Sequence, residues 1–127
     1  GLNQEVTLVD NLPHKDVLQK YMEADVFLLP SFEEGVANVV LESMALGTFV
    51  ISTDCGGMKE VISDGTNGFI VPIRDTRAIK ESILRYMAMP EDKRFEIRKN
   101  ARSTILEHHL IDRQVSQMTE LYTEVLR

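Results

Sequence analysis

Two short apolar runs constrain the fold of this chain more than any other feature. Residues 25–30 read DVFLLP and residues 49–53 read FVIST, and both are nearly continuously apolar instead of alternating with polar residues. That pattern is typical of strands that are buried on both faces, as in a parallel sheet covered by helices. Two further β-rich runs, EVTLVD at residues 5–10 and GFIVP at residues 68–72, predict two more strands.

Helical periodicity accounts for the segments between and after these strands. It predicts helices over residues 14–24, 37–46, 58–63, 76–89, 91–108 and 112–127. Gly47 suits a left-handed stop after the second helix, and Thr76 is the predicted N-cap of the fourth. The last helix repeats apolar residues at helical spacing, namely Val115, Met118, Tyr122 and Val125. Strands that alternate with helices form βαβ units, so the predicted class is α/β with a helical tail.

The length of 127 residues allows one domain at most. Four strands are few for a doubly wound sheet, in which about five or six are usual. The chain also opens on GLNQEVTLVD, without a starting Met and almost directly in a strand-like run. We therefore interpret residues 1–127 as a single domain, the later portion of a Rossmann-like, three-layer domain of a longer protein. The sheet edge that this leaves unpaired would favour an artificial dimer.

The acidic composition excludes several classes of partner. The formal net charge is −6 and the pI is about 5.0, so the chain has no electrostatic footprint for nucleic acid or anionic lipid. The basic residues between 93 and 102 are interleaved with acidic ones, which favours a solvated helix face. Cys55 is the only cysteine, which rules out an internal disulfide and fits a reducing compartment. No apolar run approaches the ~20 residues that a membrane-spanning helix needs.

Three predicted loops follow the carboxyl ends of strands, where open parallel sheets bind their ligands. They are PSFEEGVAN at residues 30–38, TDCGGMKE at residues 53–60 and PIRDT at residues 72–76. The first two contain glycine and lead straight into helices, whose N-terminal N–H groups suit a phosphate or diphosphate. The candidate cleft-lining residues in these loops are Ser31, Asp54, Gly56 and Gly57. A purely steric reason for the glycines is the alternative.

Two glutamates border the first of these loops. Glu34 lies on the turn, and Glu42 lies eight residues later on the predicted helix. At about 1.5 Å per residue they are on the order of 12 Å apart, and eight steps of roughly 100° leave them about 80° apart around the helix. One carboxylate could hold a sugar, the helix N-terminus a diphosphate, and the other carboxylate a ribose, because a carboxylate accepts two hydrogen bonds side by side. On spacing alone, two solvated surface glutamates are the alternative.

Residues 24–75 resemble the C-terminal domain of retaining glycosyltransferases with the GT-B fold, in particular the nucleotide-sugar-dependent enzymes of family four. The matching elements occur in family order. They are ADVFLLPS, an E-x7-E motif from Glu34 to Glu42, ESMALGTFVIST, GGMKEVI with Glu60, and DGTNGFIVP with Asp75 soon after. The resemblance implies a hexosyltransferase that transfers a sugar, with retention, to a glycan, lipid or polysaccharide precursor. This chain would be the later part of its nucleotide-sugar-binding C-terminal domain.

Carried over by position, the resemblance implies roles for six residues. Glu34 would be catalytic, contacting the donor sugar and stabilising charge at the reacting centre, and Glu42 would hold the ribose hydroxyls. The residues whose backbone would face the diphosphate and sugar are Gly35, Val36, Ala37 and Asn38. The resemblance implies no metal and no cofactor, with a UDP- or GDP-sugar as the donor. It also implies a cytoplasmic active site, with the parent protein either soluble or peripheral at the inner face of the membrane.

The chain departs from the family pattern at several positions. Val36 replaces the commoner aromatic residue, and Ser43 and Phe49 replace the usual Ala and Pro, which leaves the backbone contacts available. VDNLPH at residues 9–14 replaces a glycine-containing turn, so the base contact that the family makes there is not carried over. The family's basic diphosphate-binding residues and its acceptor-binding N-terminal domain precede the matched region. This chain alone is therefore predicted to be inactive.

Two other functions stay open from the sequence. A GT-B-type nucleotide-sugar epimerase would need carboxylates and histidines from regions outside these residues, and the E-x7-E frame argues against it. A non-catalytic Rossmann-like nucleotide-binding or scaffold module would have no reason to retain both Glu34 and Glu42.

Overall fold

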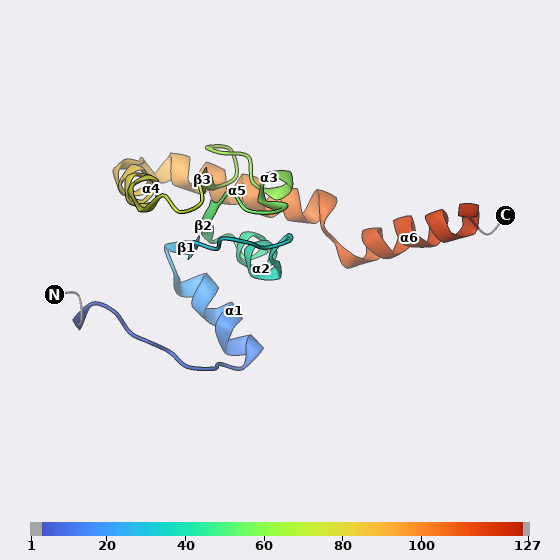
Figure 1. The fold of residues 1–127 in the computed structure, drawn as a ribbon, viewed down its shortest axis with the longest axis horizontal. Coiled ribbons are helices and arrows are strands. Elements are labelled where there is room, and N and C mark those ends of the chain that lie inside the picture. Colours follow the sequence, from blue (N-terminus) through green and yellow to red (C-terminus); the bar gives the residue numbers. More distant parts are fainter. Residues whose placement is uncertain (1–3, 126–127) are drawn as a thin grey trace.

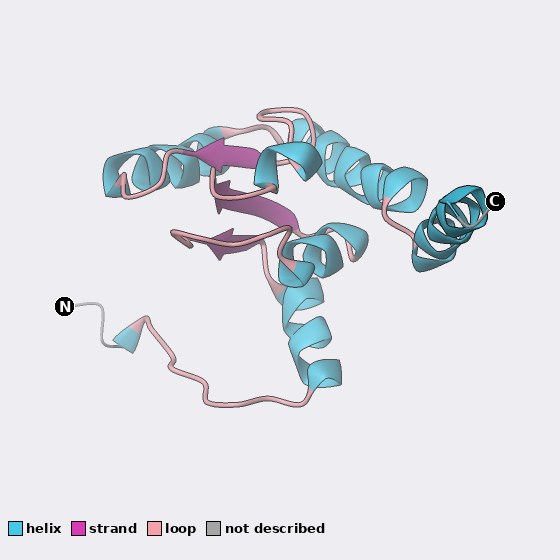
Figure 2. Ribbon diagram, turned by 45° about the vertical axis from the view of Figure 1, so that its right-hand side comes forward, coloured by secondary structure: helices cyan, strands magenta, loops and turns pink. Residues whose placement is uncertain are grey.

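A parallel sheet of three strands lies at the centre of the structure, a computed structural model that describes residues 4–125. The strands are β1 (Val26–Leu29), β2 (Phe49–Thr53) and β3 (Phe69–Val71), in the spatial order β1-β2-β3. Val26 pairs with Phe49, and Ile51 pairs with Phe69. Figure 2 shows the three strands running in the same direction. The predicted α/β class with a parallel sheet is confirmed.

The central strand β2 is buried along its whole length, as its uninterrupted apolar pattern predicts. Its side chains alternate between the two faces of the sheet. Phe49 and Ile51 join one core cluster, whereas Val50 joins the other. Strand β1 is only half-buried because it lies at an edge of the sheet.

Helices cover both faces of this sheet, and six α-helices occur among residues 4–125. They are α1 (His14–Glu23), α2 (Asn38–Ala45), α3 (Met58–Val61), α4 (Thr76–Ala88), α5 (Glu91–His108) and α6 (Ile111–Val125). Helices α2 and α3 pack with Val50 on one face, and α4 packs with Phe49 on the other. Helix α5 contributes to both faces, because Ile97 joins the cluster of Phe49 while Ala101 and Ile105 join that of Val50.

Two departures from the family pattern are explained by this packing. Phe49 fills the face covered by α4, with its ring centroid 4.9 Å from that of Phe69 and 4.7 Å from that of Tyr86. Ser43 is buried in α2, and its hydroxyl donates a 2.9 Å hydrogen bond to the carbonyl of Val40. The phenyl ring is therefore part of a core cluster, and the buried hydroxyl is satisfied within its own helix.

The prediction of a strand at residues 5–10 is wrong. This segment forms no strand among the described residues, and Val6, Leu8 and Val9 are 56%, 93% and 57% exposed. Figure 1 shows it leaving the body of the molecule ahead of α1. Its apolar residues fit a strand, but a strand also needs a hydrogen-bonding neighbour, and this segment pairs with none of the three strands of the described sheet.

The helix boundaries agree with the predicted ones to within a few residues. Gly47 follows α2 with a φ of 79°, which confirms the left-handed stop. The N-cap of α4 is Asp75 instead of Thr76, because the Asp75 carboxylate accepts a 2.9 Å hydrogen bond from the Ala78 N–H. Residues 126–127 of the predicted last helix lie outside the described residues.

Helix α6 extends away from the rest of the molecule (Figure 1). Its predicted apolar stripe forms one face of the helix, but those residues do not pack on the body. Val115, Met118, Tyr122 and Val125 are between 51% and 74% exposed. None of them belongs to either core cluster of the described residues.

Candidate functional site

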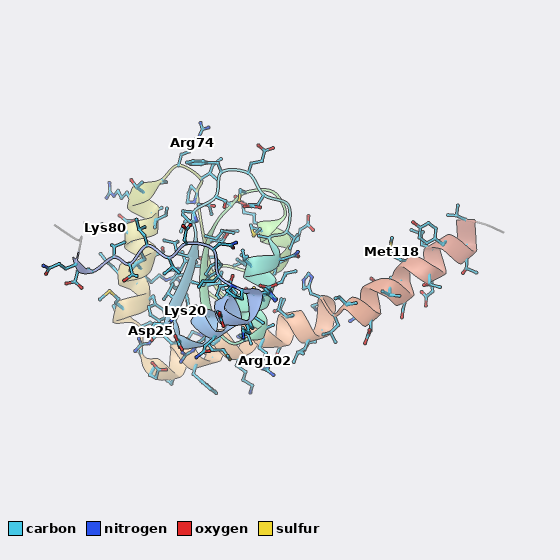
Figure 3. All side chains as sticks on the ribbon, turned by 90° about the horizontal axis from the view of Figure 1, so that it is seen from below. Lys20, Asp25, Arg74, Lys80, Arg102 and Met118 are labelled. Carbon is cyan, nitrogen blue, oxygen red and sulfur yellow. The ribbon has the colours of Figure 1, made fainter. Side chains whose placement is uncertain are left out.

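The three predicted ligand-binding loops lie at one edge of the sheet, beyond the carboxyl ends of β1, β2 and β3. Figure 3 labels Arg74, which follows β3, at this edge and Asp25, which precedes β1, at the opposite edge. The loop that contains Ser31 and Glu34 follows β1, and the loop that contains Gly56 follows β2. The topology therefore brings together the residues that the sequence analysis singles out.

The turn at Glu34 rests directly on the turn at Gly56. Gly56 has a φ of 53°, and a Cβ atom added there would lie 2.7 Å from the carbonyl carbon of Glu34 and closer still to its oxygen. A Cβ atom added at Gly57 would lie 2.7 Å from a methyl group of Val36. At Gly56 only glycine permits this approach, because the neighbour is backbone. At Gly57 a Cβ atom would instead displace the Val36 side chain. The two glycines therefore support the backbone of the first loop, which is a steric reason for their presence.

A buried hydroxyl anchors the start of the same loop. Thr53 is 1% exposed, and its Oγ1 donates a 2.6 Å hydrogen bond to the carbonyl of Ser31 and lies 3.3 Å from that of Leu29. The Asp54 N–H donates to the carbonyl of Val71 at 2.7 Å, which ties the second loop to β3. Sequence reasoning missed the role of Thr53. Its position as a polar residue at the end of a buried strand could have indicated a hydrogen bond to a neighbouring loop.

Glu34 is exposed on the first loop, with open space beside it. Its Oε1 accepts a 3.2 Å hydrogen bond from the hydroxyl of Ser31. A Cβ atom added at Gly35 would meet no other atom within 4 Å. The backbone at Gly35 is therefore accessible to a ligand.

Helix α2 begins directly after this loop without a side-chain cap. Its N-cap is Ala37, which has no side-chain oxygen for the N–H groups of the first turn, whereas the Asp75 side chain caps α4. Asn38, the first residue of α2, is exposed. These N–H groups and the partial positive charge of the helix N-terminus suit an anionic ligand.

Glu42 lies further along α2, where α1 approaches it. Its side chain is 31% exposed, and its Oε1 lies 3.0 Å from Nε2 of His14. Burial, and secondarily the charge of Glu42, raise the pKa of the Tyr21 phenol on α1 above its ordinary value. Glu42 is thus held between two helices and is not a freely solvated glutamate. The sequence did not indicate the contact with His14.

Two further charged residues of this edge, Asp54 and Arg74, contact neighbouring side chains. The carboxylate of Asp54, a predicted cleft-lining residue, pairs with the ammonium group of Lys59. The guanidinium of Arg74 lies 5.5 Å from the ring centroid of Phe32, and Arg74 adopts a left-handed φ of 59°. Sequence reasoning missed this pair, which joins the loop after β3 to the loop after β1.

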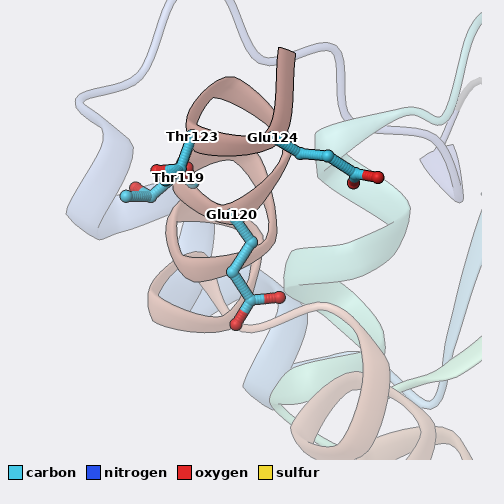
Figure 4. A pocket seen from close by; sticks show the side chains of 4 residues that line it. All are labelled: Thr119, Glu120, Thr123 and Glu124. Atoms are coloured by element: carbon cyan, nitrogen blue, oxygen red, sulfur yellow. The ribbon is translucent and has the colours of Figure 1, made fainter. Parts of the chain in front are cut away.

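Three hollows of the surface lie away from Glu34 and Glu42. One, of about 410 Å³, follows the exposed surface of α6 and is lined by Thr119, Glu120, Thr123 and Glu124, as Figure 4 shows. Another, of about 390 Å³, is lined by residues of α5 and by Gly47. A third, of about 240 Å³, lies between β3 and α4. None of these three hollows is lined by Glu34 or Glu42.

Two further properties concern the described part of the chain, residues 4–125. It contains no group of three or more His, Cys, Asp or Glu side chains arranged to hold a metal ion. None of its helices is both long and apolar enough to cross a membrane.

Solved structures of known proteins share this fold. Sucrose-phosphate synthase from Thermosynechococcus elongatus superposes on 98% of this chain, with a TM-score of 0.89 and 30% identity, and this chain covers 31% of it. Anabaena Alr3699/HepE, solved in complex with UDP-glucose, superposes on 86% with a TM-score of 0.78 and 22% identity, and 30% of it is covered.

Curated relatives agree with these structures. The N-acetyl-alpha-D-glucosaminyl L-malate synthase of Bacillus anthracis is 33% identical over 104 residues, which are 82% of this chain and 27% of that protein. The D-inositol 3-phosphate glycosyltransferase of Nocardia farcinica is 33% identical over 76 residues, which are 60% of this chain and 17% of that protein. The chain thus spans less than a third of the length of these relatives. Residues 1–89 match the family model described as Glycosyl transferases group 1, and the chain belongs to that family.

Proposed function

We propose that this chain forms part of the donor site of a glycosyltransferase that transfers a sugar, with retention, from a nucleotide-sugar to a glycan, lipid or polysaccharide precursor. Its membership of the Glycosyl transferases group 1 family supports this activity. The remaining part of the active site, including the acceptor-binding domain, would come from the rest of a longer protein. The free Cys55 supports a cytoplasmic active site, because reducing compartments keep thiols unpaired.

The observation that carries the proposal is the geometry of the loop before α2. The turn at Glu34 packs directly against Gly56, and the space beside Gly35 is open. Helix α2, which follows, has no side-chain cap at its N-cap residue Ala37. A diphosphate placed over this turn would meet N–H groups of residues 35–38 and the N-terminus of the helix. These groups would offset its negative charge without a metal ion or another cofactor.

The two glutamates would bind the ends of such a donor. Glu34 would contact the hydroxyls of the donor sugar, and Glu42 would accept hydrogen bonds from the two ribose hydroxyls. UDP- and GDP-sugars are the expected donors. The complex of Anabaena Alr3699/HepE with UDP-glucose supports the uridine class, since that protein shares the fold.

The transfer breaks the bond between the anomeric carbon of the sugar and a diphosphate oxygen, and the electron pair leaves on the diphosphate. The acceptor hydroxyl forms its new bond to the same carbon on the same face, and its proton passes to the departing diphosphate. Positive charge develops on the sugar ring as the bond breaks. The carboxylate of Glu34 would stabilise that charge.

Binding of UDP-, GDP- and ADP-glucose to this chain, measured by ligand-observed NMR, tests the proposal. We expect one nucleotide class to bind and Glu42→Ala to weaken that binding about tenfold or more, because hydrogen bonds to a carboxylate are lost. Glu81→Ala is the matched control, since Glu81 pairs with Arg77 on the exposed surface of α4. Unchanged binding in Glu42→Ala would contradict the ribose role. Binding of none of the three sugars would contradict a donor site in this chain.

A further inference from the structure

His14 reaches Glu42 from a distant part of the sequence. The two residues are 28 positions apart, and Nε2 of His14 lies 3.0 Å from Oε1 of Glu42. An ionised carboxylate only accepts hydrogen bonds, so the imidazole is the donor in this contact. His14 is the first residue of α1 and follows Pro13. The contact therefore depends on how α1 is placed against α2.

The position of α1 is set by packing near its opposite end. Tyr21 is 8% exposed, and its ring meets that of Phe27 edge-on with centroids 5.1 Å apart. The buried hydroxyl of Thr48, just after α2, donates a 2.6 Å hydrogen bond to the carbonyl of Tyr21. These contacts tie α1 both to β1 and to the end of α2. Because α1 is fixed against β1 and against the end of α2, its first residue His14 lies beside Glu42.

The contact leaves Glu42 free to bind a ligand. His14 occupies Oε1, while Oε2 accepts no hydrogen bond from the described residues. Each carboxylate oxygen has two acceptor positions, so both oxygens can still receive a hydroxyl. A glutamate side chain loses considerable rotamer freedom when it binds in one orientation. A neighbour that already holds the carboxylate reduces this loss on binding.

We propose that His14 is a positioning residue of the donor site, which holds Glu42 for the ribose hydroxyls of a nucleotide-sugar and makes this binding tighter as the pH falls. The inference rests on the proposed function and adds to it a positioning group and a pH dependence. Histidine changes its charge between about pH 5 and 8. Protonated imidazole carries a hydrogen on both nitrogens and always donates through Nε2, whereas neutral imidazole carries only one.

One feature of the surroundings opposes this direction, because His14 is the first residue of α1 and the N-terminus of a helix carries a partial positive charge. The charged side chains nearby do not oppose it. Tyr21 is a titratable group that interacts with Glu42, and it is neutral in this pH range because its pKa is raised above the ordinary value. Lys15 and Asp16 follow His14 on the first turn of α1 and carry opposite charges. The diphosphate diester of UDP-glucose itself has no group that titrates in this range.

The test compares the dissociation constants of UDP-glucose and GDP-glucose at pH 6 and pH 8 for the chain and its variants. We expect binding to the unmodified chain to be about two- to fivefold tighter at pH 6, the range that an exposed ion pair supplies. His14→Ala should weaken binding at pH 6 by a similar factor and remove the pH dependence. His14→Gln should restore much of the affinity that His14→Ala loses at pH 6, through its amide donor, but without the pH dependence. His108→Ala, at the exposed end of α5, should change neither.

The outcomes separate this inference from the proposed function. If Glu42→Ala abolishes binding while His14→Ala keeps both the affinity and the pH dependence of the unmodified chain, the role of His14 is refuted and the donor site stands. If Glu42→Ala has no effect on binding, the ribose role of Glu42 and the role of His14 are refuted together. If neither sugar binds, the donor site is refuted as well. Amide spectra of the variants check that exposed His14 can be replaced without loss of the fold.

Discussion

At the residue scale, the two glycine positions of the candidate site differ in what surrounds them. Gly56 has a left-handed φ and faces the carbonyl of Glu34, whereas Gly35 faces open space and has no left-handed φ. In the sequence the two glycines are similar, because each lies in a predicted loop between a strand and a helix. The structure therefore assigns one of them to packing and leaves the other accessible.

Alanine at each position should separate these two properties. We expect Gly56→Ala to lower the free energy of unfolding by about 3 kcal/mol, because a Cβ atom collides with backbone and the left-handed conformation is strained. Gly35→Ala should leave stability unchanged or raise it by up to about 1 kcal/mol, yet weaken nucleotide-sugar binding because its methyl group enters the open space. Urea denaturation and ligand-observed NMR measure the two effects. A stable Gly56→Ala variant would contradict the packing described between the two loops.

The candidate residues were predictable only in part. Glu34 and Glu42 belong to a short motif whose spacing is visible in one segment, so the sequence indicates both, although their roles stay predictions. His14 and Thr53 contact this segment from other elements. Such contacts depend on how α1 and β2 are placed in space, and no local pattern in the sequence records that placement.

At the element scale, the predictions succeed where a residue pattern and its surroundings agree. The apolar run of β2 is long, uninterrupted and central, and all five of its residues are buried. The run at residues 5–10 has similar residue types but no neighbouring strand in the described sheet, and it stays extended and exposed. Local propensity decides which residues suit a strand, whereas pairing decides whether the strand forms.

At the start of α4, residue type alone does not decide which residue caps the helix. Thr76 and Asp75 are both good N-cap residues, and only the geometry shows that the Asp75 carboxylate accepts the hydrogen bond from Ala78. We expect Asp75→Ala to lower the free energy of unfolding by about 1 kcal/mol. Thr76→Ala is the matched control and should change it by less than about 0.5 kcal/mol. Thermal denaturation of both variants shows which residue caps α4. A larger loss of unfolding free energy in Thr76→Ala would support Thr76 as the N-cap, as the sequence predicts.

At the scale of the whole molecule, stability is concentrated in the sheet and the helices that cover it. Both core clusters draw on β2, and α5 contributes buried residues to each of them. Helix α6 is joined to the end of α5, but the exposed apolar residues of its stripe add nothing to either cluster. The body of the chain should therefore fold without α6.

Removal of residues 110–127 tests this division. We expect the shortened chain to unfold with a free energy within about 1 kcal/mol of the full chain, because exposed residues contribute little burial. Ile105→Ala, near the end of α5, is the contrasting variant. Its side chain is 6% exposed within a core cluster, and its truncation should cost about 2–4 kcal/mol. If urea denaturation shows the opposite order, with the larger loss on removing α6, then the apolar stripe of α6 is buried in solution, either against the body or against a second copy of the chain.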